Sequence, residues 1–319
     1  MSRTTVLSIV GPGRSGTTIL GSVLGEADGV VSAGELRWLW RQGLLEGRPC
    51  GCGAAVDECP VWSKVLARAL SGGDETPSGI AAALDELASR RHRLRAIRLG
   101  ALGRGGWPAL ERVRAVTAQL VPAIAEVTGA RVIVDTSKRA QDAALLAGLP
   151  DVDHYVLHMV RDPRAVAWSW QRSDKTIRVG GATRPMATRE LVPSVARWTE
   201  NSLCAEVLRR YVPPERWMFL RYEDFAARPQ ETVSAILAFL RQPVATPFED
   251  GDTVLLRENH TVAGNPNRFR TGRVRIALDD EWSRSMPVRR QLAVRALAWP
   301  FLLRYGYLSG ALRDRFRRA

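Results

Sequence analysis

Lysine, cysteine and long apolar runs are scarce in this chain. Among its 46 Lys and Arg residues only three are lysine, namely Lys64, Lys138 and Lys175. Four cysteines in 319 residues are too few for a disulfide framework. No stretch of about 20 consecutive apolar residues occurs, which argues against a membrane-spanning helix. The short apolar run near the N-terminus leads directly into a glycine-rich motif, so we interpret it as a strand rather than a signal peptide and expect a cytoplasmic protein.

The chain is rich instead in apolar residues and arginine. Hydrophobic residues make up 45% of it, enough for the core of a folded domain. The formal net charge of +13 favours a polyanionic partner: a nucleotide, an acidic acceptor, nucleic acid or a membrane surface. No RNA-binding or helix-turn-helix signature accompanies the charge, so we do not expect nucleic acid. No repeat, linker or composition break divides residues 1–319, which predicts a single domain.

The N-terminal segment has the pattern of a strand, a glycine-rich turn and a helix. Val6–Val10 is a short apolar run, Gly11–Gly16 is a turn, and the apolar spacing that follows suits a helix. This arrangement forms an anion cradle, because free backbone N–H groups and the positive end of the helix dipole point at one spot. The Gly-x-x-x-x-Gly spacing matches a phosphate-binding P-loop. However, Thr17 and Thr18 replace the usual Lys and Ser/Thr, and the basic residue is Arg14. A purely structural turn is the alternative.

A second strand, residues 131–138, carries charged residues at its carboxyl end, where ligands bind in open parallel sheets. Asp135 alone could be a magnesium ligand, which favours a kinase or nucleotide triphosphatase. Lys138 argues otherwise, since its ammonium can neutralise a leaving phosphate without a metal.

A third strand, residues 155–160, ends at Arg161. Asp162 and Pro163 suit the cap and the first residue of a helix that begins at once. Arg161 at the strand end and Ser169 two turns into the helix could together hold one phosphate, by charge and by hydroxyl.

These segments resemble sulfotransferases that use 3′-phosphoadenosine 5′-phosphosulfate (PAPS), with features of the protein-tyrosine and carbohydrate enzymes. Arg-Ser-Gly-Thr-Thr at 14–18 is characteristic of their phosphosulfate loop, and Arg-Asp-Pro-Arg at 161–164 with Ser169 matches their 3′-phosphate motif. Asp-Thr-Ser-Lys at 135–138 is similar to their Asp-Ser-Ser-Lys segment. Gly34-Glu35 resembles the Gly-Glu of protein-tyrosine sulfotransferases. The resemblance extends from about residue 5 to residue 308.

The resemblance implies a role for each matching residue. It makes Glu35 the base that takes the acceptor proton and Lys138 the group that neutralises the leaving phosphate. The donor-binding residues that it implies are Arg14, Ser15, Gly16, Thr17, Thr18, Arg161, Ser169, Tyr222, Arg268 and Arg270. The last two lie in a polar loop, residues 260–272, that lacks the Arg-Lys-Gly triplet of the cytosolic enzymes. By position alone, Glu35 could equally be a salt-bridged residue, and His260 is the alternative base.

The fold that we expect is a three-layer, P-loop-type α/β fold with a central parallel sheet flanked by helices. Trp217–Asp224 is the last expected strand of the sheet. Residues 61–128 show only helix-type apolar spacing and predict a helical insertion on the acceptor side. The arginines between residues 90 and 98 give one of its helices a basic face, which is either solvated or in contact with a membrane surface.

Cys50, Cys52 and Cys59 form a compact cluster in the sequence. A closed zinc site usually has four ligands, and no fourth is near these three in the chain. Three thiols at this short spacing could bind zinc. We nevertheless favour a disulfide or buried thiols beside Trp62, and we assign no metal-binding residues.

The sequence thus predicts a cytoplasmic enzyme that transfers a sulfuryl group from PAPS without a metal. The acceptor would be a hydroxyl or amine of a small molecule, glycan or lipid. Two alternatives stay open: an ATP-dependent kinase built on Gly11–Thr18 and Asp135, and a nucleotide- or polyanion-binding protein without turnover.

Overall fold

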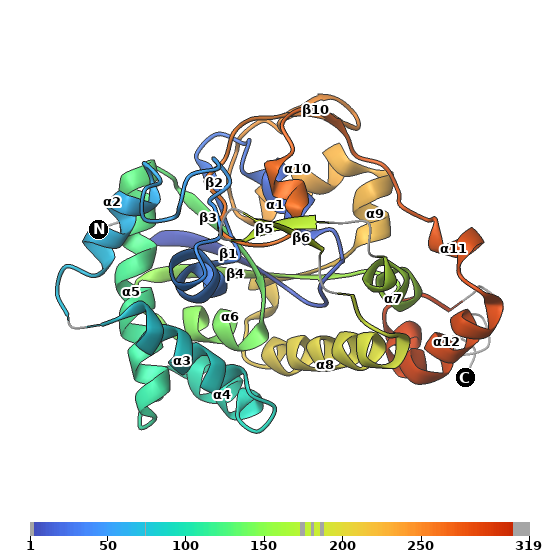
Figure 1. Cartoon of the computed structure of the whole chain (residues 1–319), viewed down its shortest axis with the longest axis horizontal. Coiled ribbons are helices and arrows are strands. Elements are labelled where there is room, and N and C mark those ends of the chain that lie inside the picture. Colours follow the sequence, from blue (N-terminus) through green and yellow to red (C-terminus); the bar gives the residue numbers. More distant parts are fainter. Residues whose placement is uncertain (1–2, 74, 173–175, 180–181, 186–187, 309–319) are drawn as a thin grey trace.

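A five-stranded parallel sheet lies at the centre of the molecule (Figure 1). The computed structural model describes residues 3–73, 75–172, 176–179, 182–185 and 188–308. The strand order is β2-β3-β1-β4-β7, and each neighbouring pair is parallel. The strands are β1 (Thr4–Val10), β2 (Val30–Gly34), β3 (Val132–Lys138), β4 (Val152–Val160) and β7 (Trp217–Arg221). The predicted α/β fold with a central parallel sheet is confirmed.

Helices cover both faces of the sheet, because the strands are apolar on both sides. Leu7 and Ile9 of β1 point to the face covered by α1, α9 and α10. Val6 and Val10 point to the opposite face, where α5, α6 and α8 pack. These helices are α1 (Thr17–Leu24), α5 (Pro108–Thr128), α6 (Ala140–Ala147), α8 (Leu191–Arg209), α9 (Tyr222–Ala227) and α10 (Pro229–Phe239). Three layers result.

The segment between β2 and β3 is helical over most of its length, in agreement with the predicted spacing. It comprises η1 (Leu36–Trp38), η2 (Leu39–Leu45), α2 (Trp62–Ala69), α3 (Pro77–Ala88), α4 (Arg93–Ala101) and α5. Helices α2 and α3 pack against α5, which itself packs against β1 and β3. Arg90 and Arg93 pair with Glu200 on α8, so part of the basic face is engaged within the molecule. Within the described ranges, no helix has both the length and the apolarity to cross a bilayer.

The last strand of the sheet is shorter than predicted. It ends at Arg221, and Tyr222 begins α9 instead of continuing the strand to Asp224. Glu223 and Asp224 lie in the first turn of this helix, where carboxylates are favourable because they face the positive end of the helix dipole.

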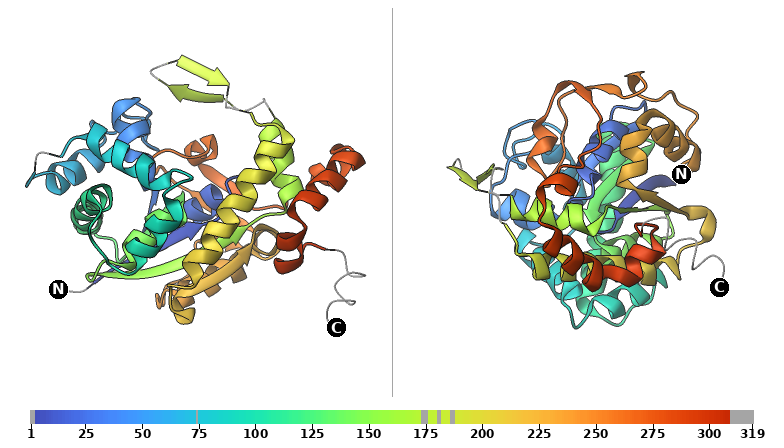
Figure 2. Two further views of the ribbon diagram at one scale, coloured as in Figure 1. Left: turned by 90° about the horizontal axis from the view of Figure 1, so that it is seen from below. Right: turned by 90° about the vertical axis from the view of Figure 1, so that its right-hand side faces the viewer.

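The remaining elements surround the carboxyl edge of the sheet or form its periphery. A three-stranded sheet has the order β10-β9-β8, and β5 pairs with β6 in a hairpin that stands out from the body (Figure 2). The elements are α7 (Pro163–Gln171), β5 (Thr176–Val179), β6 (Ala182–Pro185), η3 (Pro214–Arg216), β8 (Phe248–Asp250), β9 (Thr253–Leu256), η4 (Pro266–Phe269), β10 (Gly272–Arg275), α11 (Trp282–Ser285) and α12 (Val288–Arg304).

Candidate active site

Most of the predicted site residues gather at one edge of the sheet. Parallel strands end on the same side, so the groups that follow β1, β2, β3, β4 and β7 all lie there. The strand order fixes their sequence along the edge. Glu35 follows β2 and Lys138 ends β3, the glycine-rich turn follows β1, and Arg161 and Tyr222 follow β4 and β7. Segments far apart in the chain therefore form a single row of polar groups.

The turn between β1 and α1 has the backbone of an anion cradle. Gly16, the residue before the helix, has φ 81° and leaves the helix without a side-chain cap. A Cβ at this position would lie 2.5 Å from the Tyr222 ring, so glycine is required both by φ and by this contact. The Ser15 hydroxyl is fully buried and has no hydrogen-bond partner among the described residues. The Arg14 guanidinium lies 4.6 Å from the centre of the Trp170 ring.

Thr17 and Thr18 are the first two residues of α1. The Thr17 side chain is buried, and Thr18 is half-buried. The first-turn N–H groups of a helix have no partner within the helix. A buried hydroxyl beside such groups is suited to bind an anion.

Lys138 and Glu35 form an ion pair at the ends of neighbouring strands. The Lys138 ammonium also donates to the Thr136 carbonyl at 3.0 Å. Glu35 is held through its main chain, since its N–H donates to the Val262 carbonyl at 2.8 Å. Gly34 before it has φ 78°, and a Cβ there would lie 2.4 Å from the same carbonyl oxygen. The backbone thus places the Glu35 carboxylate beside the ammonium.

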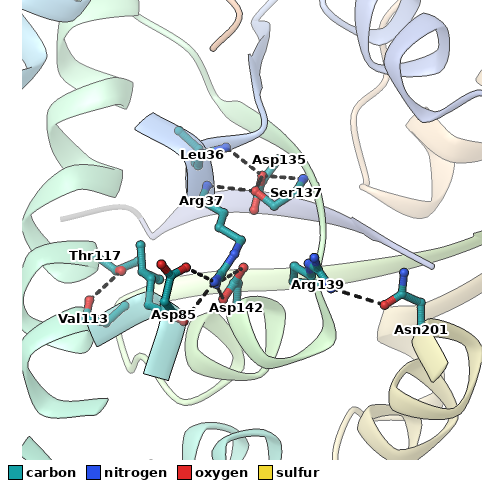
Figure 3. Close-up of polar contacts among 11 residues, drawn as sticks. Leu36, Arg37, Asp85, Val113, Thr117, Asp135, Ser137, Arg139, Asp142 and Asn201 are labelled. Carbon is teal, nitrogen blue, oxygen red and sulfur yellow. Dashed lines mark hydrogen bonds and ion pairs between the residues drawn. The ribbon is translucent and has the colours of Figure 1, made fainter. Parts of the chain in front are cut away.

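Asp135 serves to hold this part of the backbone. Its Oδ1 atom accepts hydrogen bonds from the Ser137 N–H at 2.9 Å and the Leu36 N–H at 3.3 Å (Figure 3). Burial raises the pKa of Asp135 to about 6. These contacts join β3 to the turn after β2. Asp135 therefore has a structural role, which differs from the role of a magnesium ligand.

Arg161 and Tyr222 lie together at the other end of the row. The guanidinium lies 4.4 Å from the centre of the Tyr222 ring, and its Nη2 atom donates to the Asp279 carbonyl at 2.5 Å. Nη2 also lies 3.1 Å from the Asp279 carboxylate. Arg161 Nε is buried and has no partner in the described part of the chain. Asp162 caps α7 through the Arg164 N–H, as predicted, and Ser169 is half-buried on the same helix.

The two predicted residues of the late loop do not join this row. Arg268 is buried, and its terminal nitrogens donate to the main-chain carbonyls of Thr261 at 2.6 Å and Pro49 at 2.5 Å. Burial lowers its pKa to about 10. Arg270 is exposed at the end of η4. Through these contacts Arg268 joins two backbone segments, and we do not propose it as a donor-binding residue.

His260, the alternative base, lies among the three clustered cysteines. Its Nδ1 atom is 3.3 Å from Cys59 Sγ and 4.0 Å from Cys50 Sγ. A fourth side chain able to ligate a metal therefore lies beside the three thiols in space, although none is near them in the chain. The missing residue comes from about 200 positions later in the chain, where local spacing gives no indication of it.

A buried arginine behind the row was not predicted. Arg37 donates to the Asp142 carboxylate at 3.1 Å (Figure 3). It also donates to the Leu84 carbonyl at 2.9 Å. Burial raises the pKa of Asp142, and the neighbouring Arg37 opposes this shift. Arg139, next to Lys138, is half-buried, and desolvation lowers its pKa to about 10. The Arg37 side chain thus joins α3 to α6, two residues after Glu35.

Known proteins resemble this chain in sequence and in fold. The sulfotransferase family model matches residues 110–246. No curated protein matches the sequence. The sulfotransferase domain from the curacin biosynthetic pathway has a TM-score of 0.51 and 16% identity, covering 93% of this chain and 98% of that one. The sulfotransferase domain from the olefin synthase of Synechococcus PCC 7002 has a TM-score of 0.50 and 20% identity, covering 94% and 95%. The chain is thus similar to the sulfotransferase family over residues 110–246, and it shares its fold with these two domains.

Proposed function

We propose that this protein transfers a sulfuryl group from PAPS to a hydroxyl or amine of an acceptor. The order of groups along the sheet edge carries the proposal. A carboxylate and an ammonium, Glu35 and Lys138, lie on one side of the anion cradle, and Arg161 lies on the other. This order suits a donor in which the ribose carries the reactive phosphosulfate at its 5′ position and a separate phosphate at its 3′ position.

Two buried polar atoms support a donor of this kind. Ser15 Oγ in the cradle and Arg161 Nε beside Tyr222 both lack a partner among the described residues. A buried polar atom without a hydrogen bond costs about 1–3 kcal/mol, and a bound anion removes that cost. We assign Ser15, Thr17 and Arg14 to the 5′-phosphosulfate. Arg161, with Ser169 and Tyr222, is assigned to the 3′-phosphate.

The reaction that we propose is an in-line displacement at sulfur. The acceptor oxygen or nitrogen forms the new bond to sulfur, while the bond between sulfur and the 5′-phosphate oxygen breaks. Glu35 takes the proton from the acceptor, as a positioned general base. Lys138 moves its hydrogen bond from Glu35 to the leaving oxygen, whose growing negative charge it neutralises. This exchange frees the Glu35 carboxylate when the proton must be accepted.

The helical segment of residues 61–128 is assigned to the acceptor side. A cavity of about 50 Å³ separates it from the turn that follows Glu35. The cavity is lined by Leu36 and by apolar residues of α3 and α5, such as Ile80 and Val113. Pockets that bind ligands usually have about 300–1,000 Å³, so this cavity is too small for an acceptor and the segment closes off that end of the site. A small-molecule, glycan or lipid acceptor would approach from the open side.

A ligand panel followed by a turnover assay tests the proposal. Thermal unfolding is measured with 3′,5′-adenosine bisphosphate, with ATP and magnesium, and with AMP. We expect the bisphosphate to raise the Tm most, because it carries both phosphates that the proposed site binds. A ligand at 100 times its Kd stabilises a protein by about 2.7 kcal/mol. Transfer of labelled sulfate from PAPS to a mixture of acceptors then demonstrates the activity. Stabilisation by ATP and magnesium alone would favour a kinase, and bisphosphate binding without any turnover of PAPS would favour a binding protein.

A further inference from the structure

Three thiols and an imidazole meet at one point outside the row of donor-binding groups. They are Cys50, Cys52, Cys59 and His260, and their ligand atoms all lie within 4.8 Å of one another. Two of the thiols are buried, and the other two side chains are half-buried. His260 comes from the loop before η4. This loop packs against the turn that carries the three cysteines.

Three distances within this group are close to the edges of a metal-centred tetrahedron. With Zn–S bonds of about 2.3 Å and Zn–N bonds of about 2.0–2.1 Å, a regular tetrahedron has S···S edges of about 3.8 Å and S···N edges of about 3.6 Å. Cys52 Sγ and Cys59 Sγ are 3.8 Å apart. His260 Nδ1 is 3.3 Å from Cys59 Sγ and 4.0 Å from Cys50 Sγ. A disulfide requires about 2.05 Å between its sulfurs, and the three cysteines are free thiols.

We propose that these four side chains bind one structural Zn²⁺ ion in a closed tetrahedral Cys₃His site. Soft thiolate ligands with one imidazole select zinc over hard cations, and four protein ligands leave no position for a catalytic water. The surroundings hold the ligands in place. The Trp62 indole donates to the His260 carbonyl at 2.6 Å, and the Gly51 N–H donates to the Thr261 carbonyl at 2.9 Å. The Arg268 guanidinium, bonded to the carbonyl that precedes Cys50, places a positive charge beside the thiolates.

The zinc ion joins the turn at residues 50–59 to the segment that supports Glu35. Two residues after His260, the Val262 N–H donates to the Ala33 carbonyl at 3.0 Å, and the Val262 carbonyl accepts from the Glu35 N–H. Val262 also forms a β-bridge with Gly34. The ion therefore fixes the backbone on which Glu35 is mounted, although it takes no part in the reaction itself. This inference does not rest on the identity of the donor.

Metal analysis of the tag-free protein tests the proposal. Protein purified without chelators is expected to contain about one zinc per chain, measured by elemental mass spectrometry. Cys52→Ser and His260→Ala are each expected to lose at least about tenfold in zinc affinity, the usual effect of disturbing a zinc coordination shell. Cys204→Ser is the matched control, because Cys204 is a buried free thiol on α8 outside the cluster. It should keep its zinc.

Cobalt substitution provides a readout that does not depend on activity or on the stability of the variants. Wild-type protein reconstituted with Co²⁺ should show the intense visible bands of tetrahedral cobalt and the near-ultraviolet bands of thiolate ligation. Three outcomes would each overturn the proposal. The first is a wild-type protein that holds no zinc and whose mass shows a Cys–Cys disulfide. The second is full zinc occupancy in both ligand variants. The third is a cobalt spectrum without thiolate bands.

Discussion

Lys138 donates a hydrogen bond to the Glu35 carboxylate across 103 residues of sequence. Both side chains are 13% exposed, so the pair is largely removed from water. Opposite charges at contact in such surroundings stabilise each other more than they would at the surface. Glu35 is the proposed base, and Lys138 is the group proposed to neutralise the leaving oxygen. Because the two side chains are paired, a substitution of either one affects the other.

The first prediction concerns Glu35 as the base. Glu35→Gln keeps the size and shape of the side chain, so it should lower kcat by about 10²- to 10⁴-fold, the usual contribution of a positioned general base. The Kd for adenosine bisphosphate should hardly change. Glu26→Gln is the matched control, because Glu26 is similarly buried and accepts a hydrogen bond from the Arg257 N–H away from the site. If Glu35→Gln kept about a third of kcat or more while chemistry limited the rate, the base would be another group.

The second prediction concerns the 3′-phosphate. Arg161→Ala should weaken adenosine bisphosphate by about 1.5–3 kcal/mol, or about 10- to 150-fold, the usual value of a charged hydrogen bond. Affinity for AMP, which lacks that phosphate, should be almost unaffected. Arg273→Ala serves as the control, since Arg273 is exposed and pairs only with Glu249 among the described residues. Equal losses for the two nucleotides would mean that Arg161 acts through the fold.

The third prediction concerns magnesium. Thr17 replaces the P-loop lysine, and Asp135 is committed to the Ser137 and Leu36 N–H groups. Turnover should therefore persist after a short treatment with EDTA and should not increase when magnesium is added. Zinc in a closed thiolate site is released slowly, so brief chelation separates the two metals. Loss of turnover that magnesium alone restores would contradict the prediction.

The fourth prediction concerns acid stability. Burial lowers the pKa of His154 to about 3 and that of His158 to about 4, so both are neutral in the folded protein. The unfolded chain binds these protons below about pH 6.5, and stability therefore falls as the pH falls below that value. Each histidine should cost about 2 kcal/mol at pH 5 relative to pH 8. Asp135, whose pKa is raised to about 6, acts in the opposite direction and offsets part of this loss.

His154→Gln isolates one of these contributions. Glutamine does not titrate and can keep a hydrogen bond to the Ser8 hydroxyl, which lies 2.9 Å from His154 Nε2. Denaturant unfolding of both proteins at pH 8 and pH 5 should show a smaller loss for the variant, by about 2 kcal/mol. The same loss in both proteins would show that His154 is protonated in the folded state.

The local structure and the residues at the strand ends could be predicted from the amino-acid sequence. Short apolar runs define β1, β3 and β4, and glycine at positions 11 and 16 defines the turn between β1 and α1. Asp162 and Pro163 mark the start of α7. These features could be predicted because they depend on neighbours within a few residues, through side-chain alternation, backbone conformation and helix capping. The motifs that resemble sulfotransferases lie in the same short segments.

Contacts between groups far apart in the chain could not be predicted in this way, because they arise from the packing of the whole fold. The order of the strands pairs Glu35 with Lys138, and the packing of the loop before η4 brings His260 to cysteines some 200 residues away. The same packing buries Arg268 against the Pro49 carbonyl, although its sequence context suggested a nucleotide contact. Such contacts depend on how layers of side chains fit together over the whole chain, and no spacing within a short segment encodes them.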